Sequence, residues 1–256
     1  MRRYEISEEN WERIKEKLPC QPGYQGKRVD NRLFINAVVY VAKCGIPWRD
    51  LPERFGHWNT VYVRFRRWAK AGVWQRLFKE LADREVSTLL IDSTAVQVHQ
   101  RGSGALKKRG TKATNRRVRP LGRSRGGLTT KIHLSTDERG RIRKMVLTGG
   151  QAADVKTALE LVQGMRPDRV IADKAYDADW LLLYLDSEGV EAVIPPKRSR
   201  VEKRTIDYQA YKERNVIERT INRMKQYRKV ATRYEKTATS FLALCHLATT
   251  FINLSL

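Results

Sequence analysis

Apolar residues recur at helical spacing through the first third of the chain. The stretch "NRLFINAVVYVAKCG" (31–45) predicts an amphipathic helix that ends at a glycine. "IPWRDLPERFG" (46–56) predicts a short helix rich in turns, and "HWNTVYVRFRRWAKAG" (57–72) predicts a third helix that stops at its last glycine. This part of the chain is therefore expected to be all-helical.

The pattern changes after about residue 84. "TLLIDSTAVQVH" predicts a strand, and "LTTKIHLSTDERGRIRKMVLTGG" predicts two strands joined by a turn at "DERG". Helix and strand then alternate through "DVKTALELVQGM", "DRVIADKAY", "DADWLLLYLDSEG" and "VEAVIPP", and two helices follow over 208–229 and 237–254. The expected fold is α/β, a mixed sheet with helices packed on it. We assign residues 1–84 to a helical domain and 85–256 to the α/β domain.

Two short helices with a tight connection, the second one amphipathic and basic, are typical of a helix-turn-helix. On this interpretation the side chains that face DNA are Arg64, Arg66 and Arg67. The side chains that anchor the same helix are Val61, Phe65 and Trp68. The alternative is an ordinary three-helix bundle whose basic face lies in solvent.

The formal charge of +23 changes the picture, because self-repulsion of that size is usually offset by a polyanionic partner. Nucleic acid is the first candidate, and a membrane surface is the competing one. The longest apolar stretch, "FLALCHLATTFINL", has about fourteen residues and is too short to span a bilayer. The N-terminus is charged throughout and lacks the apolar region of a signal peptide. We therefore expect no membrane partner and a cytoplasmic, nucleoid-associated protein.

Between the first two predicted strands lies a basic segment, with eleven Lys or Arg residues from Arg101 to Lys131 and no acidic residue. Such a run is usually a disordered tail, but here it is an insertion that stays close to the sheet. We interpret 101–127 as a basic loop that orders on phosphates. Its predicted DNA contacts are Lys107, Lys108, Arg109, Arg116 and Arg117.

Two aspartates follow apolar strand residues. Asp92 lies inside "LLIDSTAV", where an unpaired buried carboxylate would be costly, so a basic partner or a metal should compensate it. Asp173 ends the strand "RVIAD", and strand ends are where α/β sheets collect functional groups. Taken alone, Asp92 could form a structural salt bridge and Asp173 could cap the helix that follows it.

A third carboxylate comes from a polar stripe on the predicted helix "YKERNVIERTINRMK". At about 100° per residue, the four residues Tyr211, Arg214, Glu218 and Lys225 stay within an arc of roughly 60°. An adjacent arc carries Ile217, Ile221 and Met224. The helix should therefore pack its apolar arc on the sheet and extend Glu218 towards the two aspartates. A solvated face with an Arg214–Glu218 ion pair explains one contact of the stripe but not the whole of it.

The three cysteines and four histidines are dispersed, so neither a disulfide framework nor a Cys/His zinc site is supported. Three carboxylates suit the hard cations Mg²⁺ or Mn²⁺. Two such ions would serve an in-line displacement at phosphorus, and the positive charge of the chain indicates that the phosphodiester belongs to nucleic acid.

The order Asp92, Asp173, Glu218, together with the signature Y-x2-R-x3-E-x6-K, resembles the DDE transposases of bacterial insertion sequences. The segments "IDSTAVQVH", "GGLTTKIHL", "LTGGQAADV" and "ADKAYDADWL" are similar to the large insertion-sequence family numbered five. The resemblance extends over nearly the whole chain.

The resemblance implies an RNase H-like catalytic domain that cuts DNA at inverted terminal repeats and joins the ends to target DNA. It implies that Asp92, Asp173 and Glu218 hold two divalent ions, and that Tyr211, Arg214 and Lys225 contact the transposon end or orient Glu218. The residues Lys131, His133, Asp154 and Lys174 lie in segments like those of the family and would support the site or contact DNA, the alternative being that they are plain surface residues. Pairing of two transposon ends implies at least a homodimer on double-stranded DNA.

Two other functions stay open on sequence alone. A DNA-binding repressor without catalysis would explain the charge but not the three carboxylates. An RNase H-like nuclease or resolvase would share the site but would not need the N-terminal helical domain.

Overall fold

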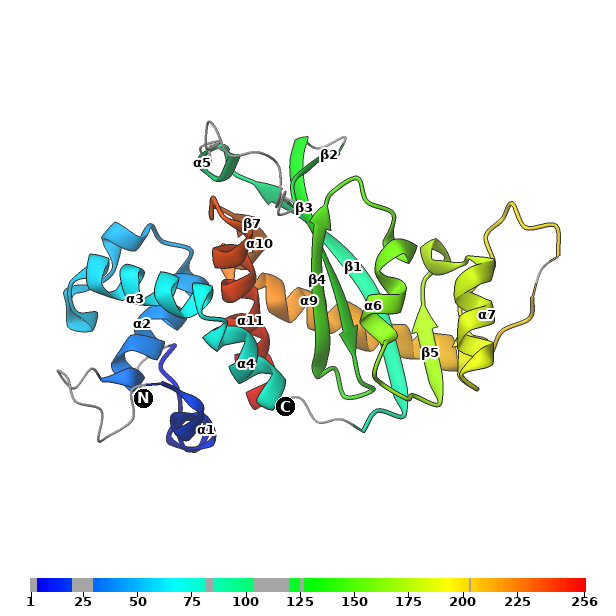
Figure 1. Cartoon of the computed structure of the whole chain (residues 1–256), viewed down its shortest axis with the longest axis horizontal. Coiled ribbons are helices and arrows are strands. Elements are labelled where there is room, and N and C mark those ends of the chain that lie inside the picture. The colour runs from blue at the N-terminus through cyan, green and yellow to red at the C-terminus, as the bar shows by residue number, and fades with distance from the viewer. Residues whose placement is uncertain (1–3, 20–29, 82–84, 104–119, 125–126, 203) are drawn as a thin grey trace. The chain divides into compact units, whose positions relative to one another are not determined.

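A computed structural model describes residues 4–19, 30–81, 85–103, 120–124, 127–202 and 204–256 (Figure 1). The chain forms two compact units. Unit 1 contains 1–81, 99–107 and 224–255, and unit 2 contains 82–98 and 108–223 together with the last residue. The division near residue 82 lies close to the predicted domain boundary, but the C-terminal segment groups with the N-terminal helices because its long apolar helix packs on them.

Unit 1 is helical. Its elements are α1 (Glu8–Ile14), η1 (Lys15–Lys17), α2 (Asn31–Cys44), η2 (Trp48–Asp50), η3 (Glu53–Phe55), α3 (Trp58–Lys70), α4 (Val73–Glu80), α5 (Gln100–Ser103), α10 (Arg228–Ala231), β7 (Thr232–Arg233) and α11 (Ala238–Leu254). The aromatic side chains of Phe34, Phe65, Trp68 and Trp74 are buried and pack edge-on or tilted against one another. These contacts join α2, α3 and α4 into one core.

The apolar stretch near the C-terminus forms α11, which packs on α2, α3 and α4. A buried helix of this kind explains why the stretch is apolar on nearly every side. Among the helices of the described residues, none has the length and apolar character needed to cross a membrane. The α2 helix ends as predicted, with Gly45 in the left-handed conformation at a φ of 75°.

Unit 2 is built on a mixed sheet. Its strands are β1 (Thr88–Val98), β2 (Gly122–Ser124), β3 (Gly127–Thr136), β4 (Ile142–Gly149), β5 (Arg169–Ala172) and β6 (Glu191–Val193). Strand β3 is antiparallel to β1, β2 and β4, whereas β1, β5 and β6 are parallel to one another. The sheet order β4-β3-β1-β5-β6 confirms the predicted mixed α/β sheet and is that of an RNase H-like domain.

The other elements of unit 2 are η4 (Asp154–Thr157), α6 (Ala158–Val162), η5 (Lys174–Tyr176), α7 (Asp179–Ser187), α8 (Tyr208–Tyr211), η6 (Lys212–Arg214) and α9 (Asn215–Lys225), whose last two residues count with unit 1. The long helix predicted over 208–229 is therefore interrupted by a 3-10 turn. The apolar arc of this helix, Ile217, Ile221 and Met224, is buried as predicted.

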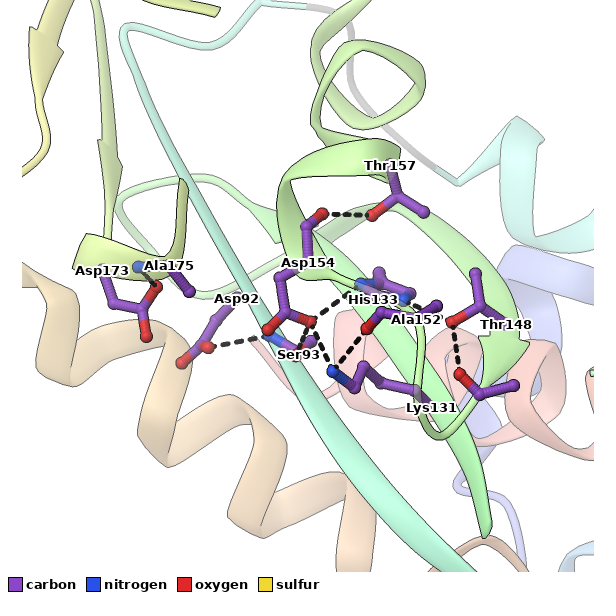
Figure 2. Close-up of polar contacts among 11 residues, drawn as sticks. Asp92, Ser93, Lys131, His133, Thr148, Ala152, Asp154, Thr157, Asp173 and Ala175 are labelled. Carbon is purple, nitrogen blue, oxygen red and sulfur yellow. Dashed lines mark hydrogen bonds and ion pairs between the residues drawn. The ribbon is translucent and has the colours of Figure 1, made fainter. Parts of the chain in front are cut away.

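The two faces of β1 have different surroundings because successive side chains of a strand alternate. Leu89 and Ile91 belong to a buried cluster that includes residues of α6 and α7. Asp92 points the other way, towards the segment that leads into α9 (Figure 2). Asp92 therefore lies on the face of β1 opposite to the cluster that contains Leu89 and Ile91.

Candidate active site

Strand pairing brings the two predicted aspartates together. In the parallel register of β1 and β5, Ile91 is paired with Ala172, so Asp92 and Asp173 are the next residues on adjacent strands. Asp92 is only 8% exposed, and its Oδ1 accepts a 2.7 Å hydrogen bond from the Ser93 backbone N–H. Asp173 caps η5, where its Oδ1 accepts the Ala175 N–H at 2.8 Å. Asp173 can therefore cap η5 and also lie beside Asp92.

Arg214 connects the strand to the helix. Its Nη2 donates to Asp92 Oδ2 at 2.7 Å, and its Nη1 forms an ion pair with Glu218 one turn further along the chain. One guanidinium therefore bridges a strand carboxylate and a helix carboxylate. The Arg214–Glu218 ion pair of the solvated-face alternative is present, but the same arginine also reaches Asp92.

The charges around Asp92 act against one another. Burial raises the pKa of the Asp92 carboxyl, the Arg214 guanidinium and the Ser93 N–H lower it, and the nearby Asp173 and Glu218 raise it again. Burial likewise raises the pKa of Tyr211, which the charge of Arg214 opposes and that of Asp173 reinforces. The three carboxylates and Tyr211 thus share one electrostatic environment.

A hard cation requires several oxygen donors that converge on one point. Within the described residues, no three His, Cys, Asp or Glu side chains form a metal-ligand cluster as they stand. Asp92 and Glu218 nevertheless share one positively charged group, the Arg214 guanidinium, and all three acidic residues offer carboxylate oxygens. The residues fit a divalent cation in donor chemistry, and Arg214 is the group that such an ion would have to displace.

A second polar cluster lies on the opposite face of β1, centred on Asp154 (Figure 2). Asp154 Oδ1 accepts the Ser93 hydroxyl at 2.6 Å and lies 3.0 Å from Lys131 Nζ. His133 Nδ1 is 3.6 Å from the same oxygen, and His133 Nε2 is 2.7 Å from Thr148 Oγ1. Strands β1 and β3 and the turn η4 are therefore joined through one carboxylate.

This cluster changes the expectation for two predicted DNA contacts. His133 has no exposed surface, so a direct contact with DNA does not fit its position. Burial lowers its pKa to about 4, which keeps the imidazole neutral near pH 7. Lys131 also donates to the Ala152 carbonyl at 2.8 Å, and only 16% of its side chain is exposed. Both residues support β3.

Ser93 is a residue of the candidate site that the sequence did not indicate. It links the two clusters, since its hydroxyl donates to Asp154 and its backbone N–H donates to Asp92. A serine directly after a strand aspartate gives no periodic signal, so only the fold reveals the link.

The remaining predicted residues lie as follows. Lys174 is exposed next to Asp173, and Lys225 is half-buried at the end of α9. In unit 1, Val61, Phe65 and Trp68 are buried as predicted, and Arg66 and Arg67 are exposed. Arg64 instead packs over Phe34 and Trp68, at 4.2 and 4.9 Å from the ring centroids, and bonds to Asn31. Outside the described residues lie Lys107, Lys108, Arg109, Arg116 and Arg117.

Comparisons with known proteins identify the family of the chain. A family described as "Transposase DDE domain" matches residues 84–253, and one described as "Putative transposase of IS4/5 family" matches residues 6–78. A putative transposase for insertion sequence element IS6501 from Brucella ovis is 40% identical over 129 residues, which are 49% of this chain and 98% of that protein. An uncharacterized protein y4sN from Sinorhizobium fredii is 39% identical over 107 residues, which are 41% and 86% of the two chains.

Among solved structures, the piggyBac transposase in a synaptic complex with hairpin DNA aligns with a TM-score of 0.51 at 12% identity. The alignment covers 96% of this chain and 70% of that one, so it shows a shared fold. The transposase family matches about two thirds of the chain, and the three acidic residues lie on β1, directly after β5 and on α9. The chain belongs to the DDE transposases of bacterial insertion sequences.

Proposed function

We propose that the chain cuts DNA at the inverted terminal repeats of its element and joins the ends to target DNA, with Asp92, Asp173 and Glu218 as metal ligands. The observation that carries the proposal is the Arg214 bridge between Asp92 and Glu218, beside Asp173 in the strand register. A cation already lies where two of the three acidic groups meet. When bound there, two Mg²⁺ or Mn²⁺ ions would activate the attacking oxygen and stabilise the leaving one.

The chain's own residues have separate tasks in this proposal. Ser93 and Arg214 fix the carboxylate of Asp92 through their hydrogen bonds. The Arg214 guanidinium also orients Glu218, and it would be free to contact a DNA phosphate if divalent ions took its place between the two carboxylates. Lys225, Lys174 and Tyr211 would contact the phosphates of the transposon end.

The partner in this proposal is double-stranded DNA at the nucleoid of a bacterial cytoplasm, with at least two copies of the chain on a pair of ends. The charge of +23 supports it, because cations that replace counterions on phosphates supply most of the affinity for DNA. Binding should therefore weaken steeply as the salt concentration rises.

The test measures cleavage of labelled transposon-end duplexes in Mg²⁺ or Mn²⁺. Asp92→Asn, Asp173→Asn and Glu218→Gln should each lower cleavage by at least about 100-fold and leave DNA binding largely intact. Glu213→Gln is the matched control, because Glu213 is an exposed carboxylate in the turn just before α9. Cleavage that persists in any of the three variants would remove that residue from the proposed site.

Products of the same reaction separate the alternatives. Joined donor and target strands support a transposase, cleavage without joining supports a nuclease, and binding without cleavage by the wild-type chain supports a repressor.

A further inference from the structure

Helix α7 is apolar on more sides than it buries. Its residues 180–185, "WLLLYL", are all aliphatic or aromatic and, at about 100° per residue, surround the helix. Leu181 and Leu185 belong to the buried cluster of unit 2, whereas Trp180 is 46% exposed and Leu183 is 68% exposed. A helix that is apolar all round is normally buried. We call Trp180, Leu183, Tyr184 and Ser187 the outer face of α7.

A groove of about 270 Å³ lies beside this outer face. Its apolar lining comes from Val162 and Met165 after α6 and from Tyr184 and Leu185 of α7, and Ser187 also lines it. The groove is smaller than the pockets of about 300–1,000 Å³ that hold small ligands. It is several times larger than the roughly 30 Å³ of one water molecule. A groove of this size suits one large side chain that protrudes from a partner.

Charge decides which partner fits the outer face. Residues 179–193, which include α7 and β6, contain four acidic residues and no Lys, Arg or His, in a chain whose formal charge is +23. This local negative charge repels nucleic acid and anionic membrane surfaces. It attracts a basic protein, and a second copy of this chain is one.

The two ends of α7 have neighbours of opposite charge. Beside the start of the helix, Arg200 Nη2 lies 2.6 Å from Asp179 Oδ1, and Arg200 belongs to the loop 197–204, which has five Lys or Arg and one acidic residue. At the other end, Asp186 and Glu188 are exposed. The helix therefore has a basic segment at its start and acidic side chains at its end.

This arrangement is complementary to itself. In a two-fold dimer the same surface contacts its own copy, so two α7 helices would pack antiparallel. The basic segment of one copy would then face the acidic end of the other. Trp180 of one copy would lie opposite Ser187 and the groove of the other, and Leu183, between them in the sequence, would lie near the two-fold axis.

We propose that two copies of the chain associate through α7. Trp180 of each copy enters the groove of the other, Leu183 packs across the axis, and Arg198 faces Glu188. A nine-residue helix is about 14 Å long, so the interface is small and the association is weak. The contact itself needs no DNA. That it helps to hold two transposon ends together rests on the proposed function.

The first experiment is sedimentation equilibrium of the full chain without DNA, in EDTA, from about 1 to 200 µM. The wild-type chain should dimerise with a Kd of about 10 µM. Leu183→Asp should raise this Kd at least about 10-fold, because two like charges meet at the axis. Tyr208→Asp is the matched control, since Tyr208 is 61% exposed on α8 of unit 2. Both positions are exposed, so both variants should keep the wild-type unfolding transition in urea.

A crosslink tests the two-fold geometry. Cys20 and Cys44 are replaced by serine, while Cys245 is fully buried and stays. In that background Leu183→Cys should give a disulfide-linked dimer on oxidation with copper phenanthroline, and Tyr208→Cys should not.

Charge exchange tests the direction of the two helices. Arg198→Glu and Glu188→Arg should each weaken the dimer, because both residues are exposed and each change places like charges opposite each other. The double variant should restore dimerisation, since the exchanged charges are again opposite.

Two results would overturn the inference. One is a wild-type chain that stays monomeric over the whole concentration range. The other is a dimer that Leu183→Asp does not weaken and that Leu183→Cys does not crosslink. These measurements contain no DNA, so their failure leaves the proposed function untouched. A chain that dimerises through α7 but does not cut transposon ends would contradict the proposed function alone.

Discussion

The carboxylate of Asp92 is oriented by two hydrogen bonds in series that begin at Asp154. The Ser93 hydroxyl donates to Asp154 at 2.6 Å, and the Ser93 N–H donates to Asp92 at 2.7 Å. We expect Ser93→Ala to lower cleavage of transposon ends about 10-fold, because the strand backbone next to Asp92 loses its anchor. The variant should also need more Mn²⁺ for half-maximal cleavage, which a purely structural role would not explain.

Ser135→Ala is the control for that change. Ser135 lies on β3, and its hydroxyl donates to the Leu161 carbonyl at 3.3 Å, away from Asp92. Both variants should lose about 1 kcal/mol of unfolding free energy. Equal cleavage and an equal Mn²⁺ requirement in the two variants would show that the link through Ser93 only stabilises the fold.

At the scale of elements, local signals predicted most of the fold. Glycines with left-handed backbone end or flank the helices at Gly45 and Gly72, and short runs rich in apolar and β-branched residues predicted β1 and β3. The break between α8 and α9 gave no such signal, because Tyr211 to Lys225 fits one continuous helical wheel. There α8 contacts β5 and β6 and η6 contacts β5, and tertiary contacts of this kind can override local propensity.

The sequence predicted some residues of the candidate site but not the contacts between them. Asp92 and Asp173 were visible because carboxylates rarely follow apolar strand residues. The bridge from Arg214 to both Asp92 and Glu218 was not, since it depends on how α9 meets the sheet. Asp154 contacts Ser93 and Lys131, which are distant from it in the chain, and a single sequence gives no signal for such contacts.

The end of α2 offers a test of close packing. Gly45 has a φ of 75°, and a Cβ placed on it would lie 2.7 Å from the Cβ of Arg228 at the start of α10. A Cβ is fixed by its backbone, so the contact cannot relax by side-chain rotation alone. We expect Gly45→Ala to lower the unfolding free energy by about 2 kcal/mol or more, as measured by urea denaturation.

Gly72→Ala provides the comparison for this substitution. Gly72 has a similar φ of 69°, but its nearest neighbour would be the flexible end of Arg76 at 3.6 Å. Gly72→Ala should lower the unfolding free energy only by the cost of placing a Cβ on a left-handed backbone, about 1 kcal/mol. Equal losses at the two glycines would mean that the contact with Arg228 carries no cost.

At the scale of the whole molecule, each unit buries one histidine that resists protonation. Burial lowers the pKa of His133 in unit 2 and of His246 in unit 1 to about 4, from an ordinary value of 6.5. His246 stacks on Phe78 with ring centroids 5.4 Å apart, and His133 is bonded to Thr148. Neither ring has a hydrated surface on which to place a charge.

The unfolding free energy should therefore fall as the pH is lowered from about 6.5 to 4. In this range the unfolded chain binds a proton at each histidine and the folded chain does not, so the unfolded state is favoured. Each histidine contributes a loss of roughly 3 kcal/mol over the range. Urea denaturation between pH 7 and 4.5 should show a shallower pH dependence for His133→Gln and His246→Gln, and shallower still for the double variant. An unchanged slope in both single variants would mean that other groups, such as the carboxylates, control the acid sensitivity.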